Sequence, residues 1–392
     1  MPKFFYRDLL KKRAAVSKRL VDMPQLFDLP SGSSSSEEKR ETDARRRASV
    51  LDSAIQKLMV PPNQSAGRPI AARFAFLAPT QVVKALCREE NFANYGVKLS
   101  LLSAKTLAYK RKPLKFAKRL QAGSFGSVSA YQAHDGAYIA FKHFLRGAVD
   151  EREVDVIKKL QKLDLDRSVV VAARYLPRLK TVAMHKYNFT LNDLKTAVQA
   201  RPYTVNSMML YRSVVEAVAK SLRYVWTKSK KKLVYMDMKP RNVLVRCVDK
   251  DKTLAVAIGD LGGFATVDQR AVPTYPHWFL SKRYDDLTTA RPEYIGWACI
   301  SLYLLMLGVR IRTGHDNPDH PWPVLYHQGA LNAVTYDQVR DKILQRVDRL
   351  RLVLKRGALE DFRKIPNVLK RALGMDLYKH VDRLANRMFL GK

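Results

Sequence analysis

A polar octapeptide between two apolar runs constrains the fold of this chain more than any other stretch. Residues 233–245 read Leu-Val, then Tyr-Met-Asp-Met-Lys-Pro-Arg-Asn, then Val-Leu-Val. The second apolar run predicts a short buried strand, so the octapeptide is expected on a loop at the edge of a sheet. Asp237, Lys239 and Asn242 then converge on this loop. Such a set suits work on a phosphate–metal complex, because the carboxylate orients a hydroxyl, the ammonium group offsets charge and the amide oxygen binds Mg²⁺.

Length and cysteine content limit the class of protein. With 392 residues, 47% of them hydrophobic, the chain has room for one large two-lobed domain or two ordinary ones. Cys87, Cys247 and Cys299 are far apart and form no C-x-x-C pair, which favours a reducing compartment over a disulfide framework or a zinc site. The first residues are charged too often for a signal peptide. The longest apolar run, 295–307, is shorter than the roughly 20 residues of a bilayer span and predicts a buried core helix.

The net charge of +35 is extreme for a chain of this length. Residues 1–110 contain 20 Lys and Arg and 10 Asp and Glu, so the remaining 282 residues carry +25. The charge is therefore spread through the part expected to fold and is not confined to a tail. Such a field attracts polyanions, whether nucleic acid, acidic proteins or anionic lipid. The dense patch 228–232 could steer such a partner or could simply be solvated.

The segment before residue 113 is expected to differ from the rest. Residues 1–50 are predicted to be a basic, partly disordered segment, because the Ser-rich and charged stretch 30–49 cannot bury enough apolar surface to become ordered. Its basic clusters are either nuclear-import signals or solvated charge runs. Residues 51–112 regain apolar content and are predicted to form a helical extension, with helices at 52–60 and 80–90.

From residue 113 onwards, strand patterns come first and helix patterns follow. The expected strands are 114–122, 123–131, 137–142, two within 169–187, 243–247 and 254–258. The expected helices are 151–162, 191–200, 204–228 and most of the chain after 290. This order predicts an α+β fold with two lobes, 113–187 and 188–392, and a cleft between them.

A glycine pair, a lysine and an aspartate are further candidate functional residues, and each lies at or near an end of a predicted strand. Gly123 and Gly126 lie on one predicted hairpin, where glycine lets backbone N–H groups approach a phosphate closely, although two glycines are also typical of a plain turn. Sixteen residues after Gly126, Lys142 closes the next strand in Ile-Ala-Phe-Lys. Eighteen residues after Asn242, Asp260 ends another apolar strand in Asp-Leu-Gly.

The order of these features resembles that of eukaryotic-type Ser/Thr protein kinases. The octapeptide is similar to their catalytic loop, H-R-D-L-K-P-x-N, and Ile-Ala-Phe-Lys is similar to V-A-I-K. Gly123-x-x-Gly126 resembles the end of their Gly-rich loop, and residues 260–262 resemble D-F-G. The resemblance covers roughly residues 115–310. It implies a two-lobed protein-kinase fold, with a small antiparallel-sheet N-lobe and a mainly helical C-lobe.

The resemblance implies a role for each candidate residue. Asp237 would be the catalytic base, Lys239 would stabilise the transferred phosphoryl group, and Lys142 would grip the phosphates of ATP. Lys142 needs a carboxylate partner, for which Glu153 is the first choice and Glu151 the alternative. The implied Mg²⁺ ligands are Asn242 and Asp260. The implied ATP-binding residues are Gly123, Ser124, Phe125, Gly126, Val128, Ala140, Lys142, Glu153 and the expected hinge, Met184, His185, Lys186 and Tyr187.

The sequence departs from the kinase pattern in three places. Gln121 stands where the first glycine of the Gly-rich loop would be, and Tyr235-Met236 replaces the usual His-Arg. Without that arginine the enzyme is expected not to depend on phosphorylation of its activation loop. Arg291-Pro292-Glu293 resembles A-P-E but is followed at once by the apolar run 295–303, so the substrate-docking segment 263–293 stays open.

The leading interpretation is an ATP- and Mg²⁺-dependent Ser/Thr protein kinase that acts on protein hydroxyls. Its divergent motifs and basic chain resemble the kinases of large DNA viruses, such as herpesviruses, which implies an intracellular location in nucleus or cytoplasm of a host cell, or in the virion. One alternative is a pseudokinase scaffold. The other is a basic nucleic-acid-binding or virion structural protein, for which the charge is the only support.

Overall fold

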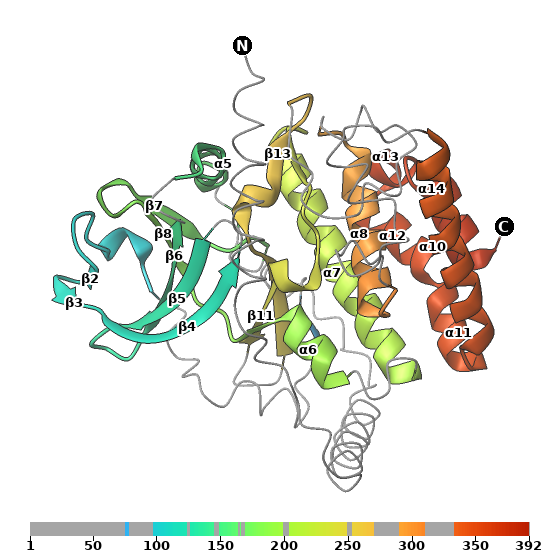
Figure 1. Ribbon diagram of the computed structural model, residues 1–392, viewed down its shortest axis with the longest axis horizontal. Coiled ribbons are helices and arrows are strands. Elements are labelled where there is room, and N and C mark those ends of the chain that lie inside the picture. The colour runs from blue at the N-terminus through green and yellow to red at the C-terminus, as the bar shows by residue number, and fades with distance from the viewer. Residues whose placement is uncertain are drawn as a thin grey trace, which may run out of the picture. The chain divides into compact units, whose positions relative to one another are not determined.

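The computed structural model describes residues 75–77, 97–123, 126–144, 149–163, 165, 169–198, 204–248, 253–269, 290–309 and 333–391. The expected linker 30–49, the expected helices 52–60 and 80–90, and the residues Ser124 and Phe125 lie outside them. The described chain is a mixed α+β protein with small antiparallel sheets and several helices, as the order of strand and helix patterns predicts (Figure 1).

A five-stranded antiparallel sheet occupies the first part of the described chain. In spatial order its strands are β4 (Lys115–Gly123), β5 (Gly126–Gln132), β6 (Tyr138–Phe144), β8 (Thr181–His185) and β7 (Ala173–Leu176). The turn between β5 and β6 places Gly136 at φ 79°, in the left-handed region that favours glycine. The register pairs Val128 with Lys142 and Lys142 with Val182. Because side chains directly opposite each other share a face, these three lie on the same side of the sheet.

Residues that precede the sheet cover its other face. Val97 and Tyr109 are buried in one hydrophobic cluster with Ile139 and Phe141 of β6. The covering segment consists of a 3₁₀ turn (Leu99–Leu101) and a hairpin of β2 (Ala108–Tyr109) and β3 (Lys112–Pro113). Over residues 97–112, the expected helical extension therefore takes the form of a short turn and a hairpin and contains no α-helix.

Helix α5 (Glu151–Gln161) follows β6 in the sequence and matches the expected helix 151–162. Asp150 caps its start, because its carboxylate accepts hydrogen bonds from the backbone N–H groups of Arg152 and Glu153 at 3.0 and 3.4 Å. Val154 and Ile157 form part of its buried face, as their spacing predicts. Glu153 is buried as well, although it is charged, so it must have a partner inside the protein.

Two smaller sheets hold the two ends of the octapeptide. One has the order β1 (Ala75–Leu77), β12 (Thr253–Ile258), β11 (Val243–Val248) and β9 (Phe189–Thr190). The other pairs β10 (Leu233–Tyr235) with β13 (Phe264–Thr266). All these pairings are antiparallel. The octapeptide ends β10 and leads into β11, so it does lie at strand ends, as its flanking apolar runs predict.

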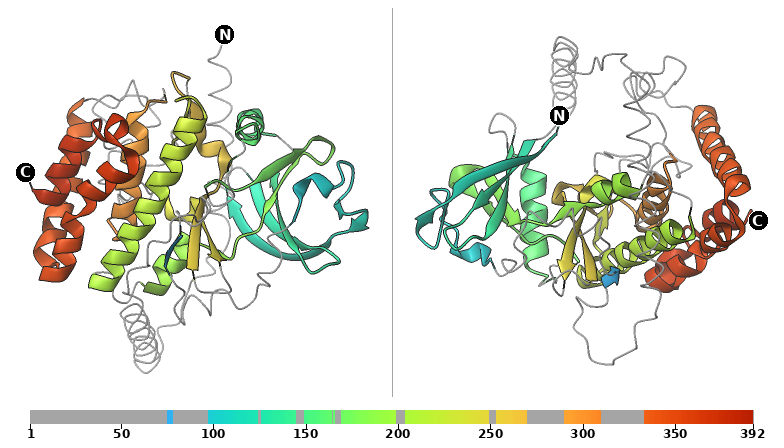
Figure 2. Two further views of the ribbon diagram at one scale, coloured as in Figure 1. Left: turned by 180° about the vertical axis from the view of Figure 1, so that it is seen from behind. Right: turned by 90° about the horizontal axis from the view of Figure 1, so that it is seen from below.

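Most of the remaining described elements are helices. They are α6 (Leu191–Val198), α7 (Val205–Lys228), α8 (Glu293–Met306), α10 (Ala333–Val353), α11 (Arg356–Arg363), α12 (Ile365–Leu373), α13 (Met375–Tyr378) and α14 (Asp382–Ala385). Helix α7 packs against α8, α11 and α12, and Figure 2 shows the C-terminal helices, in orange and red, grouped together. Every residue of α8 from Tyr294 to Met306 is buried, which agrees with the expected core helix. Among the described helices, none combines the length and apolar content that crossing a membrane would require.

Candidate active site

Lys142 on β6 lies between two carboxylates that come from distant parts of the chain. Its Nζ atom is 2.6 Å from Oε2 of Glu153, in the first turn of α5, and 3.0 Å from Oδ1 of Asp260, which follows β12. Glu153, and not the alternative Glu151, is thus the partner of Lys142. Asp260 is separated from Lys142 by 118 positions in the sequence, so only the fold brings the two groups together.

Burial and charge set the state of these three groups. Burial alone would lower the pKa of Lys142, but the charges of Asp260 and Glu153 outweigh it and raise that pKa above its ordinary value. Lys142 is therefore a permanent ammonium group at neutral pH. The Glu153 side chain is only 4% exposed, whereas that of Asp260 is 37% exposed. Glu153 can only hold the lysine, while Asp260 also remains accessible to a ligand.

A second cluster forms around Asp237 in the octapeptide. Lys239 Nζ lies 2.7 Å from Oδ2 of Asp237. The Asn242 side-chain amide donates hydrogen bonds to the same Oδ2 at 2.9 Å and to the Asp237 carbonyl oxygen at 2.8 Å. A 3₁₀ turn (Pro240–Asn242) makes this possible, because it folds the chain back so that position 242 reaches position 237. The three residues predicted to converge on this loop do converge.

Tyr235 links the two clusters. Its buried hydroxyl donates a hydrogen bond to the carbonyl oxygen of Gly259 at 2.8 Å and lies 3.3 Å from that of Asp260. Its ring packs edge-on against Phe264 with the ring centroids 4.8 Å apart. Burial, with a further contribution from the charge of Asp237, raises the pKa of the Tyr235 phenol well above its ordinary value. The hydroxyl therefore stays protonated and acts as a donor.

The backbone around Asp260 is tightly constrained. Asp260 has φ 47° and ψ 71°, a left-handed conformation that L residues adopt at a cost. A Cβ atom on Gly263 would come within 2.8 Å of the Tyr235 ring and 3.1 Å of the Asp237 Cβ, so only glycine fits there. Gly263 was not among the residues predicted from the sequence; the signal was the second glycine directly after Asp-Leu-Gly. Tyr235 was predicted only as a departure from the kinase pattern and not as a member of the site.

Backbone pairing keeps Asn242 beside the segment that carries Asp260. The N–H group of Gly259 donates to the Asn242 carbonyl oxygen at 2.7 Å, next to the register pair of Val243 and Ile258. The N–H group of Met236 similarly donates to the Gly263 carbonyl oxygen at 2.7 Å. Both ends of the segment 259–263 are thus bonded to the octapeptide.

The donor set near these residues fits a magnesium ion that also binds phosphate. Asn242 uses its amide nitrogen on Asp237, which leaves its amide oxygen as the atom suited to a cation. Asp260 uses Oδ1 on Lys142 and has a second carboxylate oxygen. The described residues contain no group of three or more His, Cys, Asp or Glu that could enclose a metal. One carboxylate and one amide oxygen nevertheless suit Mg²⁺, which usually keeps several waters and takes phosphate oxygens as further ligands.

The register of the five-stranded sheet shows which of the predicted ATP-binding side chains lie on the same face as Lys142. Val128 and Ala140 share a face with Lys142, and Met184 joins them because it pairs with Ala140. His185, the next residue, points to the opposite face, where its Nε2 lies 2.7 Å from the Val97 carbonyl oxygen. The sequence predicted His185 as an ATP-binding residue together with Met184. The His185 side chain lies on the face of the sheet opposite to Lys142.

The other candidates lie at the adjoining ends of β4 and β5 and directly after β8. Gly123 and Gly126 face each other where β4 turns into β5, and a Cβ atom on Gly126 would collide with the His143 carbonyl oxygen. Lys186 and Tyr187 follow β8 and lead into β9, so they do connect the two larger sheets. The Lys186 Nζ donates to the Tyr187 carbonyl oxygen at 3.1 Å.

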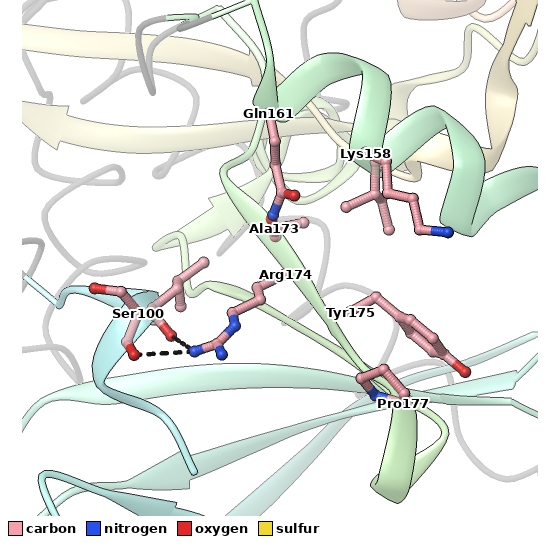
Figure 3. A pocket seen from close by; sticks show the side chains of 9 residues that line it. Ser100, Lys158, Gln161, Ala173, Arg174, Tyr175 and Pro177 are labelled. Atoms are coloured by element: carbon pink, nitrogen blue, oxygen red, sulfur yellow. Dashed lines mark hydrogen bonds between the residues drawn. The ribbon is translucent and has the colours of Figure 1, made fainter. Parts of the chain in front are cut away.

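A cavity of about 380 Å³ lies away from these residues (Figure 3). It is bounded by the 3₁₀ turn Leu99–Leu101, helix α5 and strand β7, and Lys158 and Tyr175 line it. Arg174 crosses one wall and donates hydrogen bonds to the carbonyl oxygens of Leu99 and Ser100 at 2.8 and 3.0 Å. None of the predicted site residues lines this cavity, so it does not bear on their chemistry.

Comparison with known proteins adds no family to this picture. No protein-family model matches the chain, and no curated protein is significantly similar to it. The case for a function therefore rests on the residues Lys142, Glu153, Asp237, Asn242 and Asp260 and on their geometry.

Proposed function

We propose that this protein is a Ser/Thr protein kinase of the two-lobed type, which transfers the γ-phosphoryl group of ATP to a protein hydroxyl with the help of Mg²⁺. The observation that carries the proposal is the position of Lys142, 2.6 Å from Glu153 and 3.0 Å from Asp260. A lysine on a strand, a helix glutamate and a carboxylate ahead of a Leu-Gly pair form the phosphate and metal anchor of such enzymes.

The architecture supports the same proposal. The five-stranded sheet with α5 corresponds to the expected N-lobe, and the helices from α6 onwards correspond to the expected C-lobe. Residues 186–188 form the direct connection between them. The hydrogen bonds from Arg174 and His185 to the segment 97–102 support assigning that segment to the proposed N-lobe rather than to a separate extension.

The proposed reaction assigns one task to each group. Lys142, held by Glu153, binds the α- and β-phosphates, and Asp260 and Asn242 provide the protein ligands for Mg²⁺. Bound Mg²⁺ would offset the charge that builds up on the phosphate oxygens. Asp237 orients the substrate hydroxyl and accepts its proton as the hydroxyl oxygen forms a bond to the γ-phosphorus. The bond from that phosphorus to the β–γ bridging oxygen breaks, ADP leaves, and Lys239 stabilises the phosphoryl group in transit.

The geometry also supports activity without phosphorylation of an activation loop. Kinases that use this switch have an arginine beside the base, where Met236 stands in this chain. The segment after Asp260 is fixed by other means. Strand β13 pairs with β10, and Lys159 of α5 donates a hydrogen bond to the Thr266 hydroxyl at 3.0 Å.

A transfer assay with matched variants tests the proposal. The full chain is incubated with labelled ATP, Mg²⁺ and a basic acceptor protein, and phosphate transfer is compared for wild type, Lys142→Met and Asp260→Asn. The controls Lys158→Met and Asp155→Asn change the same residue types on the exposed side of α5, where their side chains are 63% and 67% exposed. We expect the first pair to lose about a hundredfold or more in rate and the controls to match wild type.

Two results would contradict the kinase proposal. One is the absence of transfer by the intact chain together with saturable ATP binding, which would favour a pseudokinase scaffold. The other is transfer by Lys142→Met or Asp260→Asn at the wild-type rate, which would show that the labelled phosphate comes from a contaminating enzyme.

A further inference from the structure

The exposed edge of the five-stranded sheet carries an unusual concentration of positive charge. Between Asn91 and His134 the chain has eight Lys and Arg and no Asp or Glu. Six of these cations fall within the hairpin turn and the first half of β4, where all of them are exposed: Lys110, Arg111, Lys112, Lys115, Lys118 and Arg119. We call residues 110–120 the basic edge. Figure 1 shows β3 of the hairpin beside the start of β4.

The hairpin turn presents its cations in spite of its backbone conformation. Lys110 and Arg111 have φ values of 49° and 66°, so both adopt the left-handed conformation. Two-residue hairpin turns of this kind usually contain Asn-Gly or Asp-Gly, because long side chains are disfavoured there. Lys110 forms an ion pair, since its Nζ lies 3.1 Å from Oδ2 of Asp135 across the β5–β6 turn. A Lys-Arg pair in this conformation is the type of local outlier that accompanies a function.

The strand that follows is exposed on both faces and irregular. Strand β4 lies at the end of the strand order, and every side chain from Lys115 to Leu120 is exposed. Its pairing with β5 shifts register twice, between Phe116 and Lys118 and again between Arg119 and Gln121. Such bulges, together with lysines, prevent an edge strand from pairing with a further strand. An extended acidic peptide added to β4 by backbone hydrogen bonds is therefore disfavoured.

One aromatic side chain stands among these cations. Phe116 is 56% exposed, and its ring packs edge-on against Tyr131 of β5 with the centroids 5.6 Å apart. Tyr131 in turn packs against the buried Phe141 at 5.1 Å. Phe116 is therefore fixed on a rigid support, with more than half of its surface open. A supported ring among cations is the arrangement on which unpaired bases stack while phosphates bind nearby.

We propose that the basic edge binds single-stranded nucleic acid, with a base stacked on Phe116 and phosphates held by Lys112, Lys115 and Arg119. Lysines that only protected a sheet edge would explain one or two of these cations, but they would not explain the supported Phe116 or the cationic turn. This binding function is separate from phosphoryl transfer. Arg119, the nearest of these three cations, lies four residues from Gly123 along β4, or about 13 Å at 3.3 Å per residue, so a strand that ends at Arg119 leaves the phosphate-binding turn open.

Binding of oligonucleotides by the full chain tests this proposal. Fluorescence anisotropy measures the affinity for labelled oligo(dT) and oligo(U) from 0.05 to 0.3 M salt. The variant Lys112→Gln/Lys115→Gln/Arg119→Gln removes three charges from the basic edge. The variant Lys355→Gln/Arg363→Gln/Lys370→Gln removes the same residue types from exposed positions on helices α11 and α12 and at the residue that precedes α11. We expect the first variant to weaken binding at least tenfold and to reduce the slope of log affinity against log salt by about 2, and the second to change affinity less than about twofold.

Substitutions of Phe116 distinguish nucleic-acid binding from a general attraction of polyanions. We expect Phe116→Ala to weaken binding at least about fivefold without a change in salt slope, and Phe116→Trp to restore it, because stacking is independent of salt. The proposal is overturned if both triple variants lose affinity equally, if Phe116→Ala binds like wild type, or if duplex DNA, polyglutamate or phosphatidylserine vesicles compete as well as oligo(dT). The relative affinities for oligo(dU) and oligo(U), which share one base and differ only in the sugar, then show whether DNA or RNA binds more tightly.

Discussion

One hydroxyl group connects the two halves of the candidate active site. The Tyr235 hydroxyl bonds to the Gly259 carbonyl oxygen, next to Asp260, while its own backbone leads into Asp237. We expect Tyr235→Phe to lower stability by about 1–2 kcal/mol, because a buried carbonyl loses its donor, and to lower kcat for phosphate transfer about tenfold, because Asp260 is less firmly placed.

Urea unfolding and kinetics on the same preparation check this expectation. Tyr138→Phe at the start of β6 is the control, since Tyr138 is partly exposed and its loss should change stability by less than about 0.5 kcal/mol. Equal stability and equal kcat for Tyr235→Phe and wild type would show that the hydroxyl does not position Asp260.

The charge of Lys142 gives a second expectation, which concerns pH. Its pKa is higher in the folded protein than in the unfolded chain, so its ion pairs contribute fully below the ordinary lysine pKa of about 10.4 and weaken only as pH rises through the folded-state value. We expect Lys142→Met to cost about 3 kcal/mol of stability at pH 9, because a buried carboxylate loses its partner. The cost should be smaller at pH 6.5, because burial raises the pKa of Glu153 and loss of the Lys142 charge raises it further, so the carboxyl group binds a proton more readily at the lower pH. Urea unfolding at both values measures it. A cost that shrinks by pH 9 would mean that Lys142 has already lost its proton.

At the level of elements, helix α5 sets the position of Glu153. Asp150 bonds to the N–H groups of Arg152 and Glu153 themselves, so the cap and the Lys142 partner belong to one turn. We expect Asp150→Ala to lower stability by about 1 kcal/mol and kcat severalfold, with recovery in Asp150→Asn, because asparagine caps equally well. Thermal unfolding and transfer kinetics test this, with Asp155→Ala on the same helix as control. A loss in Asp150→Asn as large as in Asp150→Ala would assign the effect to charge rather than to capping.

Local elements could be predicted from the sequence because their causes are local. The apolar spacing of Val154 and Ile157 and the Asp135-Gly136 turn predicted α5 and the β5–β6 hairpin where they occur. The cover formed by residues 97–113 could not be predicted in this way. It depends on Arg174 and His185, which bond to backbone carbonyl oxygens more than 70 positions away, and carbonyl oxygens carry no sequence signal.

At the level of the whole molecule, the candidate site is assembled from four separated segments, and the sequence could suggest only their chemistry. Lys142, Glu153, Asp237 and Asp260 were selected by residue type and order. Their contacts depend on backbone pairings such as Met236 with Gly263 and Gly259 with Asn242, which no side-chain pattern encodes. Gly263 was missed for the same reason, since the need for glycine arises from the ring of a residue 28 positions earlier.

The same assembly leads to an expectation about regulation of the proposed activity. An activation loop that must be phosphorylated needs a cation beside the base, and Met236 occupies that position. In this protein Tyr235, the β10–β13 pairing and the Lys159–Thr266 hydrogen bond hold the segment that follows Asp260. We expect the purified chain to keep its full transfer rate after treatment with a protein phosphatase, because Met236 offers no positive charge to bind a phosphate.

Mass spectrometry before and after treatment confirms that phosphate has been removed, and the phosphatase is inhibited before the transfer assay. The variant Lys159→Met serves as the matched test of the alternative anchor, and we expect it to reduce the transfer rate severalfold, whereas Lys158→Met, one residue away and 63% exposed, does not. Loss of activity on removal of phosphate, and its recovery on rephosphorylation, would contradict this expectation. It would show that a residue other than the one at position 236 binds the phosphate and controls activity. It would also show that the contacts of Tyr235 and Lys159 are not sufficient to hold the site in its active arrangement.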